Sequence, residues 1–376
     1  MTQRINLRTQ RDLQPVVETA VVALSAGQSV VFPTETVYGL GAALFHETAV
    51  KQLLRIKGRM SGNPLSVAIS GLDMLEDLLP NLTEEQKRIP RRVWPGPVTV
   101  VLPVEEEEFF VRQLSPTAKE AVYSKEGRIG FRVPNHPLTL EVLKQFDQPI
   151  VLTSANRSGQ EESSDADAIV DSLGAEIDLL IEDGPAKSTL PSTVIGIGED
   201  GIAILREGSV SQAAVDRLKA KIVIFVCTGN TCRSPMAEVL CRQLLADHFH
   251  CSPEEVEEYG YVVMSAGVAS GDQFPASSAA QQTMTARGLS LADHQSQSLN
   301  ETHIRFADKI YAMTRSHRET ILSLWPSADT RLFVLRTDGG DIADPYGGNL
   351  ALYENCADQI EEELSKRISE ILGMEP

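Results

Sequence analysis

The segment KIVIFVCTGNTCRSP, residues 221–235, decides the fold of the second half of the chain. Residues 222–226 form a continuous apolar run rich in β-branched side chains, which is typical of a strand buried on both faces of a parallel sheet. Met236, Val239 and Leu240 then follow at helical spacing. Strand, short loop and helix in this order predict an α/β unit with its loop at the end of a buried strand.

The loop in this segment has the composition of an anion-binding site. Gly229 permits unusual backbone dihedrals and Asn230 tolerates the left-handed region, so the loop can curl with its amide N–H groups pointing inward. These amides and the positive end of the following helix attract an anion. The planar guanidinium of Arg233 can bind two phosphate oxygens at once. The pattern therefore predicts a phosphate-binding loop.

Cys227, directly after the strand, is the candidate nucleophile of this loop. Helix N-termini and neighbouring cations stabilise a thiolate, so we expect Cys227 to be ionised at neutral pH. Ser234 can donate a hydrogen bond to the sulfur, and Asp344 on a later loop can protonate a leaving group. Metal binding by Cys227 and Cys232 is disfavoured, because the sequence has no second Cys/His pair at zinc-site spacing.

These residues resemble a known family. The strand with its C-x5-R-S loop, the later Ser-Ala-Gly at 265–267 and the Asp-Pro at 344–345 are similar to the low-molecular-weight protein tyrosine phosphatases, over residues 222–372. The resemblance implies a Rossmann-like doubly wound parallel sheet and transfer of phosphate from a phosphorylated protein to Cys227. Asp344 would act first as acid and then as base, and no cofactor is implied.

The resemblance also assigns the residues of this site. Cys232 is either a packing residue or the partner of Cys227 in a reversible disulfide, as in family members. Catalysis is expected from Cys227, Arg233 and Asp344, and substrate binding from Thr228, Gly229, Asn230, Thr231, Cys232 and Ser234.

The residue after the loop asparagine bears on the substrate. Tyrosine phosphatases of this family usually carry an apolar aliphatic residue there, whereas bacterial protein-arginine phosphatases resemble this chain in carrying threonine, Thr231. Its hydroxyl could orient a polar guanidinium phosphate or the attacking water. Tyr346 is followed by two glycines rather than a second aromatic residue, which again resembles the arginine-specific branch. Phosphoarginine is thus favoured, with phosphotyrosine, or a phospho-residue reader without turnover, as alternatives.

The first half of the chain gathers polar residues after its predicted strands. Residues 33–41 follow the first strand and residues 153–156 a later one, and ligands of open α/β sheets bind at such strand ends. Arg132 lies within an apolar strand, where a cation needs an anionic partner. Further cations are Lys57, Arg59 and Arg206. These residues alone predict an anion-binding α/β pocket, without a dinucleotide fingerprint or a serine triad.

A second resemblance covers about residues 10–210. The motifs PTETVYGLG, KGR followed by NPLS, WPGPVT, FRVP, TSAN, PST and LREG occur in the order of the YrdC-like threonylcarbamoyl-AMP synthases. The resemblance implies a twisted open mixed sheet with helices. It also implies condensation of L-threonine, bicarbonate and ATP, accompanied by Mg²⁺, into threonylcarbamoyl-AMP and pyrophosphate. A downstream threonylcarbamoyl transferase would then modify tRNA.

No covalent enzyme intermediate is needed for this reaction, so catalysis would be positioning and charge neutralisation. The expected residues are Lys57, Arg59 and Arg132 for phosphates or carboxylates, Thr34, Tyr38, Ser154 and Asn156 for threonine and nucleotide, and Ser192 and Arg206 to complete the pocket.

Length and composition fit two enzymatic domains. The 376 residues exceed the roughly 100 to 200 of one ordinary domain, and 42% apolar with 23% charged residues is typical of globular enzymes. The predicted domains are residues 8–212 and 220–374. No apolar run approaches the roughly 18 residues needed to span a bilayer, which predicts a cytoplasmic protein without a membrane partner.

The net charge bears on nucleic-acid binding. A formal charge of −18 disfavours a dedicated RNA-binding protein, because binding to a phosphate backbone relies on lysine and arginine. The alternative that the first half is an RNA-binding module, with double-stranded RNA as its ligand, stays open because a local basic pocket is compatible with an acidic chain.

Overall fold

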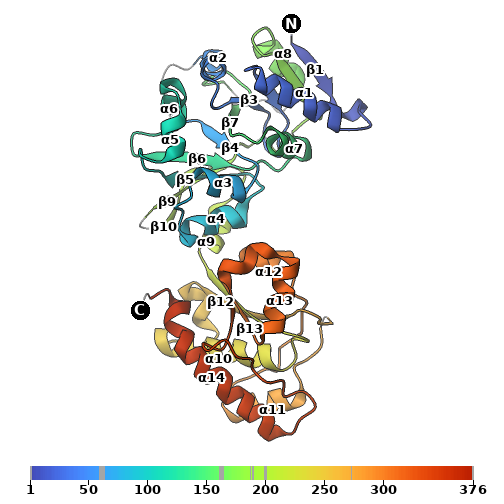
Figure 1. Cartoon of the computed structure of the whole chain (residues 1–376), viewed down its shortest axis with the longest axis vertical. Helices are drawn as coiled ribbons and strands as arrows, with labels where there is room; N and C mark the ends of the chain where they lie inside the picture. Colours follow the sequence, from blue (N-terminus) through green and yellow to red (C-terminus); the bar gives the residue numbers. More distant parts are fainter. Residues whose placement is uncertain are drawn as a thin grey trace. The chain divides into compact units, whose positions relative to one another are not determined.

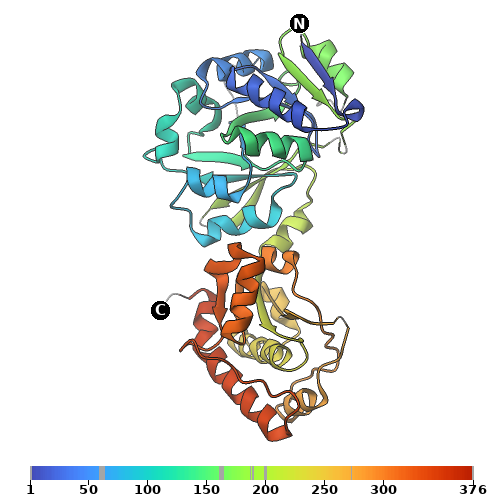
Figure 2. The same cartoon turned by 45° about the vertical axis from the view of Figure 1, so that its right-hand side comes forward.

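The computed structural model describes residues 2–58, 64–160, 165–186, 188, 190–198, 201–271 and 273–374 (Figure 1). The chain divides into two compact units, residues 1–218 and 219–376. On the colour scale of Figures 1 and 2 the first unit runs from blue to yellow-green and the second from yellow to red. Each unit has its own sheet and its own buried core.

The first unit is built on a mixed sheet, as the resemblance predicted. It contains both parallel and antiparallel pairs: β8 and β2 are parallel, for example, whereas β2 and β3 are antiparallel. In spatial order the ten strands among the described residues are β1 (Gln3–Asn6), β8 (Leu179–Glu182), β2 (Val30–Phe32), β3 (Gly39–Ala43), β7 (Ile150–Ser154), β4 (Ser66–Ala68), β6 (Arg128–Arg132), β5 (Val98–Pro103), β9 (Thr193–Gly198) and β10 (Gly201–Arg206).

Strand β3 lies in the middle of this sheet and begins within the segment that sequence analysis assigned to a polar strand end. It pairs antiparallel with both β2 and β7. Two of its residues are glycines, because neighbouring side chains leave no room for a Cβ atom at these positions. A Cβ on Gly39 would lie 2.7 Å from a methyl carbon of Leu152, and one on Gly41 would lie 3.0 Å from the ring of Phe32. Glycine therefore lets β3 fit between its neighbours, although it is disfavoured in strands generally.

Helices cover both faces of the first sheet. Helices α1 and α7 pack together, and their apolar residues, such as Val17 and Leu138, join the cluster that contains Phe32. Leu53 of α2 belongs to the cluster that contains Phe131. The helices are α1 (Gln14–Ser25), α2 (Glu47–Lys57), α3 (Leu72–Leu78), α4 (Glu84–Val93), α5 (Phe109–Gln113), α6 (Pro116–Val122), α7 (Pro137–Phe146), α8 (Ala166–Leu173) and α9 (Gln212–Leu218), with a 3₁₀ turn at Leu7–Thr9.

The second unit contains a four-stranded parallel sheet with helices on both faces, which confirms the doubly wound fold. Its strands, in spatial order, are β12 (Tyr261–Gly267), β11 (Lys221–Cys227), β13 (Lys309–Ala312) and β14 (Leu332–Val334). Its helices are α10 (Arg233–Phe249), α11 (Ser278–Ala286), α12 (Glu301–Phe306), α13 (Arg315–Leu324) and α14 (Leu350–Leu372), with 3₁₀ turns at Glu255–Tyr259 and Pro326–Arg331.

Strand β11 is buried on both faces, as its continuous apolar run predicted. Val223 and Phe225 belong to the cluster formed with α10 and α14, while Ile224 and Val226 belong to the cluster on the opposite face. The strand ends at Cys227, and α10 begins six residues later at Arg233. The core of the unit therefore fixes both ends of the predicted phosphate loop.

Candidate active sites

The loop after β11 brings polar groups to the sulfur of Cys227, which is 3% exposed. The Asn230 amide N–H donates to Cys227 Sγ at 3.2 Å, and Ser234 Oγ lies 3.0 Å from the same sulfur. Asn230 has a φ of 53°, in the left-handed region expected for it. This conformation turns the amide toward the sulfur, where it can stabilise a thiolate.

The side chain of Asn230 holds the loop in this shape. Its Nδ2 donates to Ser234 Oγ at 3.0 Å and to Ser265 Oγ at 2.8 Å. Its Oδ1 accepts from the Gln297 amide at 2.9 Å, and His294 Nε2 lies 2.8 Å from its carbonyl oxygen. Sequence analysis did not assign Ser265, Gln297 or His294 to the site. The Ser-Ala-Gly motif was the one signal for Ser265, and nothing in the local sequence marked the other two.

Arg233 is the buried cation of this site, with 4% of its surface exposed. Its Nη1 donates to the Ile342 carbonyl at 3.1 Å and its Nη2 to Asp344 Oδ2 at 2.5 Å. Its Nε has no hydrogen-bond partner among the described residues. A buried donor without a partner is unfavourable, so this edge of the guanidinium is suited to an anion.

Asp344 lies at the mouth of the site, and its side chain is about half exposed. Its Oδ1 accepts from the Tyr346 amide at 3.2 Å. The structure therefore brings together the candidate nucleophile, cation and acid, which are 117 positions apart in sequence between Cys227 and Asp344. A half-exposed carboxyl beside a buried nucleophile is placed to exchange protons with a leaving group or with water.

The other loop residues differ in their surroundings. Cys232 Sγ lies 3.4 Å from Tyr353 Oη and 3.4 Å from Ser277 Oγ. The cysteines are free thiols in this structure, so the disulfide weighed in sequence analysis is not formed in it. Thr231 Oγ1 has a distant contact of 3.7 Å to Cys232 Sγ. Its hydroxyl is therefore not engaged in a strong bond within the loop.

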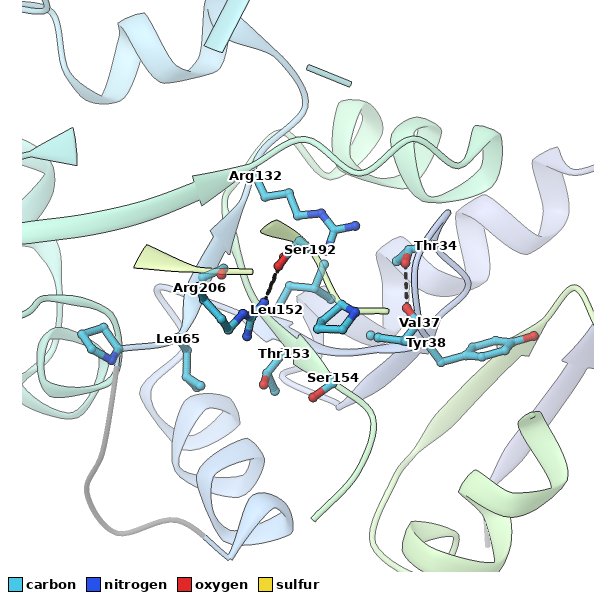
Figure 3. Close-up of a pocket in the computed structure, with 14 residues that line it drawn as sticks. Thr34, Val37, Tyr38, Leu65, Arg132, Leu152, Thr153, Ser154, Ser192 and Arg206 are labelled. Atoms are coloured by element: carbon cyan, nitrogen blue, oxygen red, sulfur yellow. Dashed lines mark hydrogen bonds between the residues drawn. The ribbon is translucent and has the colours of Figure 1, made fainter. Parts of the chain in front are cut away.

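The first unit has a polar pocket of about 200 Å³ at the ends of its central strands (Figure 3). Arg132 and Arg206 bring two cations to it, and the sticks in Figure 3 show both side chains reaching into the same space. Its lining is Thr34, Val37, Tyr38, Gly39, Pro64, Leu65, Ser66, Arg132, Leu152, Thr153, Ser154, Pro191, Ser192 and Arg206. Six predicted site residues thus line one cavity: Thr34, Tyr38, Arg132, Ser154, Ser192 and Arg206.

Arg132 is held from one side. Its Nη2 donates to Glu35 Oε1 at 2.9 Å and to Thr36 Oγ1 at 2.8 Å, while its Nε has no hydrogen-bond partner in the described part of the chain. Glu35 Oε2 accepts from the Asn135 amide at 2.8 Å. The carboxylate therefore orients the guanidinium, an arrangement that sequence analysis did not foresee because Glu35 and Arg132 meet only in the folded sheet.

The remaining polar residues are tied to each other. Lys57 Nζ donates to Asn156 Oδ1 at 2.7 Å and to the Ser154 carbonyl at 2.8 Å. Arg206 Nη2 donates to the Ser192 carbonyl at 2.7 Å and to Ser192 Oγ at 3.2 Å. Lys57 and Asn156 thus support the pocket from beside Ser154 and are not among its lining residues. Arg59 lies outside the described residues.

Tyr38 lines the pocket, but its hydroxyl group is directed elsewhere. Tyr38 Oη donates to the Gly184 carbonyl at 2.6 Å and accepts from the Asp183 amide at 3.0 Å. Figure 3 shows its ring extending away from Arg206. In this structure the hydroxyl therefore links Tyr38 to the segment after β8, and the hydrogen bond from it to threonine or nucleotide stays a prediction.

Among the described residues no group of three or more His, Cys, Asp or Glu side chains is arranged to hold a metal ion. Within the same residues, no helix combines the length and the apolar character needed to cross a membrane.

Fold and site define the second unit as an α/β domain with a cysteine-bearing anion loop, and the first as a mixed-sheet domain with a cationic pocket. The model of the low molecular weight phosphotyrosine protein phosphatases matches residues 222–373, and that of the Sua5/YciO/YrdC proteins, described as telomere recombination, matches residues 22–208. The chain therefore belongs to both families, one in each unit.

Individual relatives agree with this division. The threonylcarbamoyl-AMP synthase of Bacillus subtilis is 34% identical over 202 residues, 54% of this chain and 56% of that protein. The chain thus spans little more than half the length of that relative. The protein-arginine-phosphatase of Geobacillus stearothermophilus is 37% identical over 158 residues, 41% of this chain and 97% of that protein. A Sua5 variant from Pyrococcus abyssi shares the fold, with a TM-score of 0.52 and 24% identity, covering 77% of this chain and 90% of that chain.

Proposed function

We propose that this chain is a bifunctional enzyme, with a threonylcarbamoyl-AMP synthase in residues 8–212 and a cysteine-dependent protein phosphatase in residues 220–374. For the phosphatase, one observation carries the proposal: the sulfur of Cys227 receives an amide hydrogen bond beside a buried arginine, Arg233, that has an unpartnered Nε. A thiolate and a dianionic phosphate both need this concentration of donors.

The proposed reaction has two steps. Cys227 Sγ attacks phosphorus, the bond to the leaving group breaks, and Asp344 gives that group its proton. Asp344 then takes a proton from water, whose oxygen attacks phosphorus, and the thiolate leaves with its charge stabilised by Ser234 and the loop amide. Arg233 binds phosphate oxygens in both steps.

We propose that the physiological substrate of the phosphatase is phosphoarginine in a protein. Support comes from the protein-arginine-phosphatase relative and from Thr231, whose hydroxyl has only a weak contact within the loop. A hydroxyl at this position can bond to a guanidinium, which a methyl group cannot do. Phosphotyrosine is the competing substrate, because the matched family carries that name.

Turnover of an artificial aryl phosphate by wild type and Cys227→Ser tests the phosphatase. The serine variant should lose hydrolysis, and full activity without the thiol would refute the mechanism. Peptides carrying phosphoarginine or phosphotyrosine, compared with wild type and Thr231→Ile, then decide the substrate. The isoleucine variant should lose preference for phosphoarginine; an unaltered preference would contradict the role given to Thr231.

For the synthase, the observation that carries the proposal is the pocket of about 200 Å³ that the buried Arg132 and the more exposed Arg206 share with several hydroxyl groups. The substrates proposed are L-threonine, bicarbonate and ATP. Threonine and bicarbonate form a carbamate with loss of water, and the carbamate oxygen displaces pyrophosphate from the α-phosphorus of ATP. Positioned cations stabilise the charge that develops on the phosphates.

Roles follow from the geometry of this pocket. Arg132 presents its unpartnered Nε to a phosphate or carboxylate. Thr34 and Ser154 bring hydroxyl groups to threonine or nucleotide, and Ser192 with Arg206 completes the wall. Lys57 and Asn156 hold the Ser154 segment in place. Arg59 is proposed to contact phosphate, on the resemblance of its motif alone.

Further components of this proposal come from the chemistry. Mg²⁺ enters with ATP and is bound by phosphate oxygens, which it prefers as ligands. The product is consumed by a threonylcarbamoyl transferase that modifies tRNA, and both reactions take place in the cytoplasm.

Pyrophosphate release measured with and without threonine and bicarbonate tests the synthase. Release should require both. Tight binding of double-stranded RNA to the first unit, with no threonine-dependent release, would support the RNA-binding alternative instead.

A further inference from the structure

A buried histidine contacts the first residue of the phosphate loop and has no role in the mechanism above. His317 lies in the first turn of α13 and is 7% exposed. Its Nε2 lies 2.8 Å from Thr228 Oγ1, and its Nδ1 lies 2.9 Å from Thr314 Oγ1. Thr228 directly follows the candidate nucleophile Cys227 in the loop. The imidazole therefore joins the N-terminus of α13 to the first residue of the loop.

The charge state of this imidazole suits such a bridge. Burial, and then the charge of Arg233, lower the pKa of His317 to about 4, against the weaker opposing effects of Asp344 and Asp341. The ring is thus neutral near pH 7, with one nitrogen that donates and one that accepts. Each nitrogen faces one hydroxyl, so both threonine side chains are fixed without bringing a second positive charge beside Arg233.

The far end of the bridge is itself anchored. Thr314 Oγ1 accepts from the His317 amide at 3.2 Å, which caps α13. The next residue, Arg315, donates its amide N–H to Asp341 Oδ1 at 2.8 Å. The imidazole is therefore held in a defined position, and Thr228 receives a fixed partner rather than a mobile one.

The position of Thr228 in the loop explains why a fixed partner matters. It is exposed at the mouth of the loop and is followed by Gly229, whose backbone has wide conformational freedom. Its carbonyl accepts from the Ala269 amide at 3.0 Å, so its backbone is held from one side. The bond from His317 holds its side chain from the other. Donors that are fixed before a phosphate arrives need no reorganisation when it binds.

We propose that His317 is a positioning residue of the phosphatase site, which acts through the Thr228 hydroxyl to preorganise the start of the phosphate loop. The proposal rests on the phosphatase function proposed above. It assigns to the His317 ring a role beyond the cap of α13, because the cap uses the His317 backbone amide and Thr314 Oγ1, whereas positioning of the loop uses the ring Nε2.

Two substitutions separate these sides. His317→Gln places an amide near the position of Nε2 and can keep the bond to Thr228. His317→Asn places its amide near Nδ1 and can keep only the bond to Thr314. Thr228→Val removes the other partner, and Thr320→Val is the matched control, because its exposed hydroxyl bonds to the Ser316 carbonyl on the same helix at 2.9 Å.

The test measures kcat/KM for an aryl phosphate and the dissociation constant of inorganic phosphate in the full chain. His317→Asn and Thr228→Val should each lower kcat/KM and weaken phosphate binding by about tenfold, the usual scale for one lost bond in a polar site. Both values for His317→Gln should stay within about threefold of wild type. Thr320→Val should have the wild-type values. The Asn and Val changes combined should be no worse than either alone, because they break the same bond.

Three results would overturn the proposal: equal losses of kcat/KM and phosphate affinity in His317→Gln and His317→Asn, wild-type values for His317→Asn, or additive effects in the double variant. If wild type hydrolyses no phosphate ester, the proposed function fails. The phosphate dissociation constants then still test the inference. His317→Gln should bind phosphate more tightly than His317→Asn whether or not the enzyme turns over a phosphate ester.

Discussion

Asp344 Oδ2 lies 2.5 Å from Arg233 Nη2, so the proposed proton donor is held by the side chain that is proposed to bind phosphate. The contact leaves Arg233 Nε available for an anion. It also keeps the carboxyl at the edge of the loop, where the leaving group of the proposed reaction would depart. The pair therefore couples substrate binding to the position of the acid.

Asp344→Asn should lower kcat for an aryl phosphate by about 10²- to 10⁴-fold, the usual contribution of a general acid, because an amide has no acidic proton to transfer. Inorganic phosphate should bind as tightly as to wild type or more tightly, because a negative charge beside Arg233 is removed. Steady-state kinetics and phosphate titration check the two effects. Asp338→Asn, which alters an exposed pair with Arg336, is the control and should change neither.

Alkylation should favour Cys227 over Cys241 and Cys356. Burial raises the pKa of Cys241 and of Cys356 to about 12, so both stay as unreactive thiols far above neutral pH. Cys227 has an amide donor and Ser234 at its sulfur. Mass spectrometry after iodoacetamide treatment at pH 7 should find Cys227 modified, with protection by inorganic phosphate. Preferential labelling of Cys241 would contradict this picture.

Asn230 should contribute to stability as well as to activity. Asn230→Ala removes two side-chain donor bonds and places alanine at a φ of 53°, and should lower the free energy of unfolding of the second unit by about 3 kcal/mol. Asn230→Gly tolerates that φ and should lose about 1 kcal/mol less. Urea unfolding can be followed by Trp325 fluorescence in a Trp94→Phe background, since the chain has two tryptophans. Equal losses for both variants would contradict the backbone part of the argument.

Glu35→Gln should impair the synthase by releasing Arg132 from its orientation. The two side chains are about nine-tenths buried, so loss of the carboxylate leaves a buried cation without its partner. We expect threonine-dependent pyrophosphate release to fall by about tenfold or more. Aryl phosphate turnover in the same preparation is an internal control and should not change. Glu85→Gln, which alters a partly exposed pair with Arg88, should leave both activities intact.

Tyr38→Phe should affect stability more than substrate recognition. The hydroxyl joins the Gly184 carbonyl and the Asp183 amide, and its removal leaves two backbone groups unpaired, at a loss of about 1 to 3 kcal/mol. The KM for threonine should change little. A large rise in that KM with unaltered stability would show that the hydroxyl contacts substrate after all.

The sites differ in how much of them the sequence could predict. The phosphate loop is local: Cys227, Asn230 and Arg233 are close in sequence, and one strand and one helix fix their positions. The residues that hold the loop, such as His294 and Gln297, come from segments more than 60 positions away and are recognisable only once β11 and β12 pair. Long-range contacts of this kind have no local pattern.

The first unit shows the same limit more strongly. The sequence indicated the polar strand ends and the mixed sheet, but not that residues 39–43 form a central strand, because glycine is unusual there. It indicated that Arg132 needs an anionic partner, yet Glu35 could not be chosen among many carboxylates. Tyr38 was assigned to the pocket correctly as a lining residue, while the direction of its hydroxyl depended on β8, which sequence analysis did not predict.

The four clusters of buried apolar residues each belong to one unit or the other, although one polypeptide carries both. Because one polypeptide carries both units, translation produces the cationic pocket and the cysteine loop in equal numbers, whatever the level of expression. A cell that needs more of one activity than the other cannot obtain it through synthesis. One route is to inactivate one site on chains that already exist, and chemical modification of the Cys227 thiol would do this for the cysteine loop.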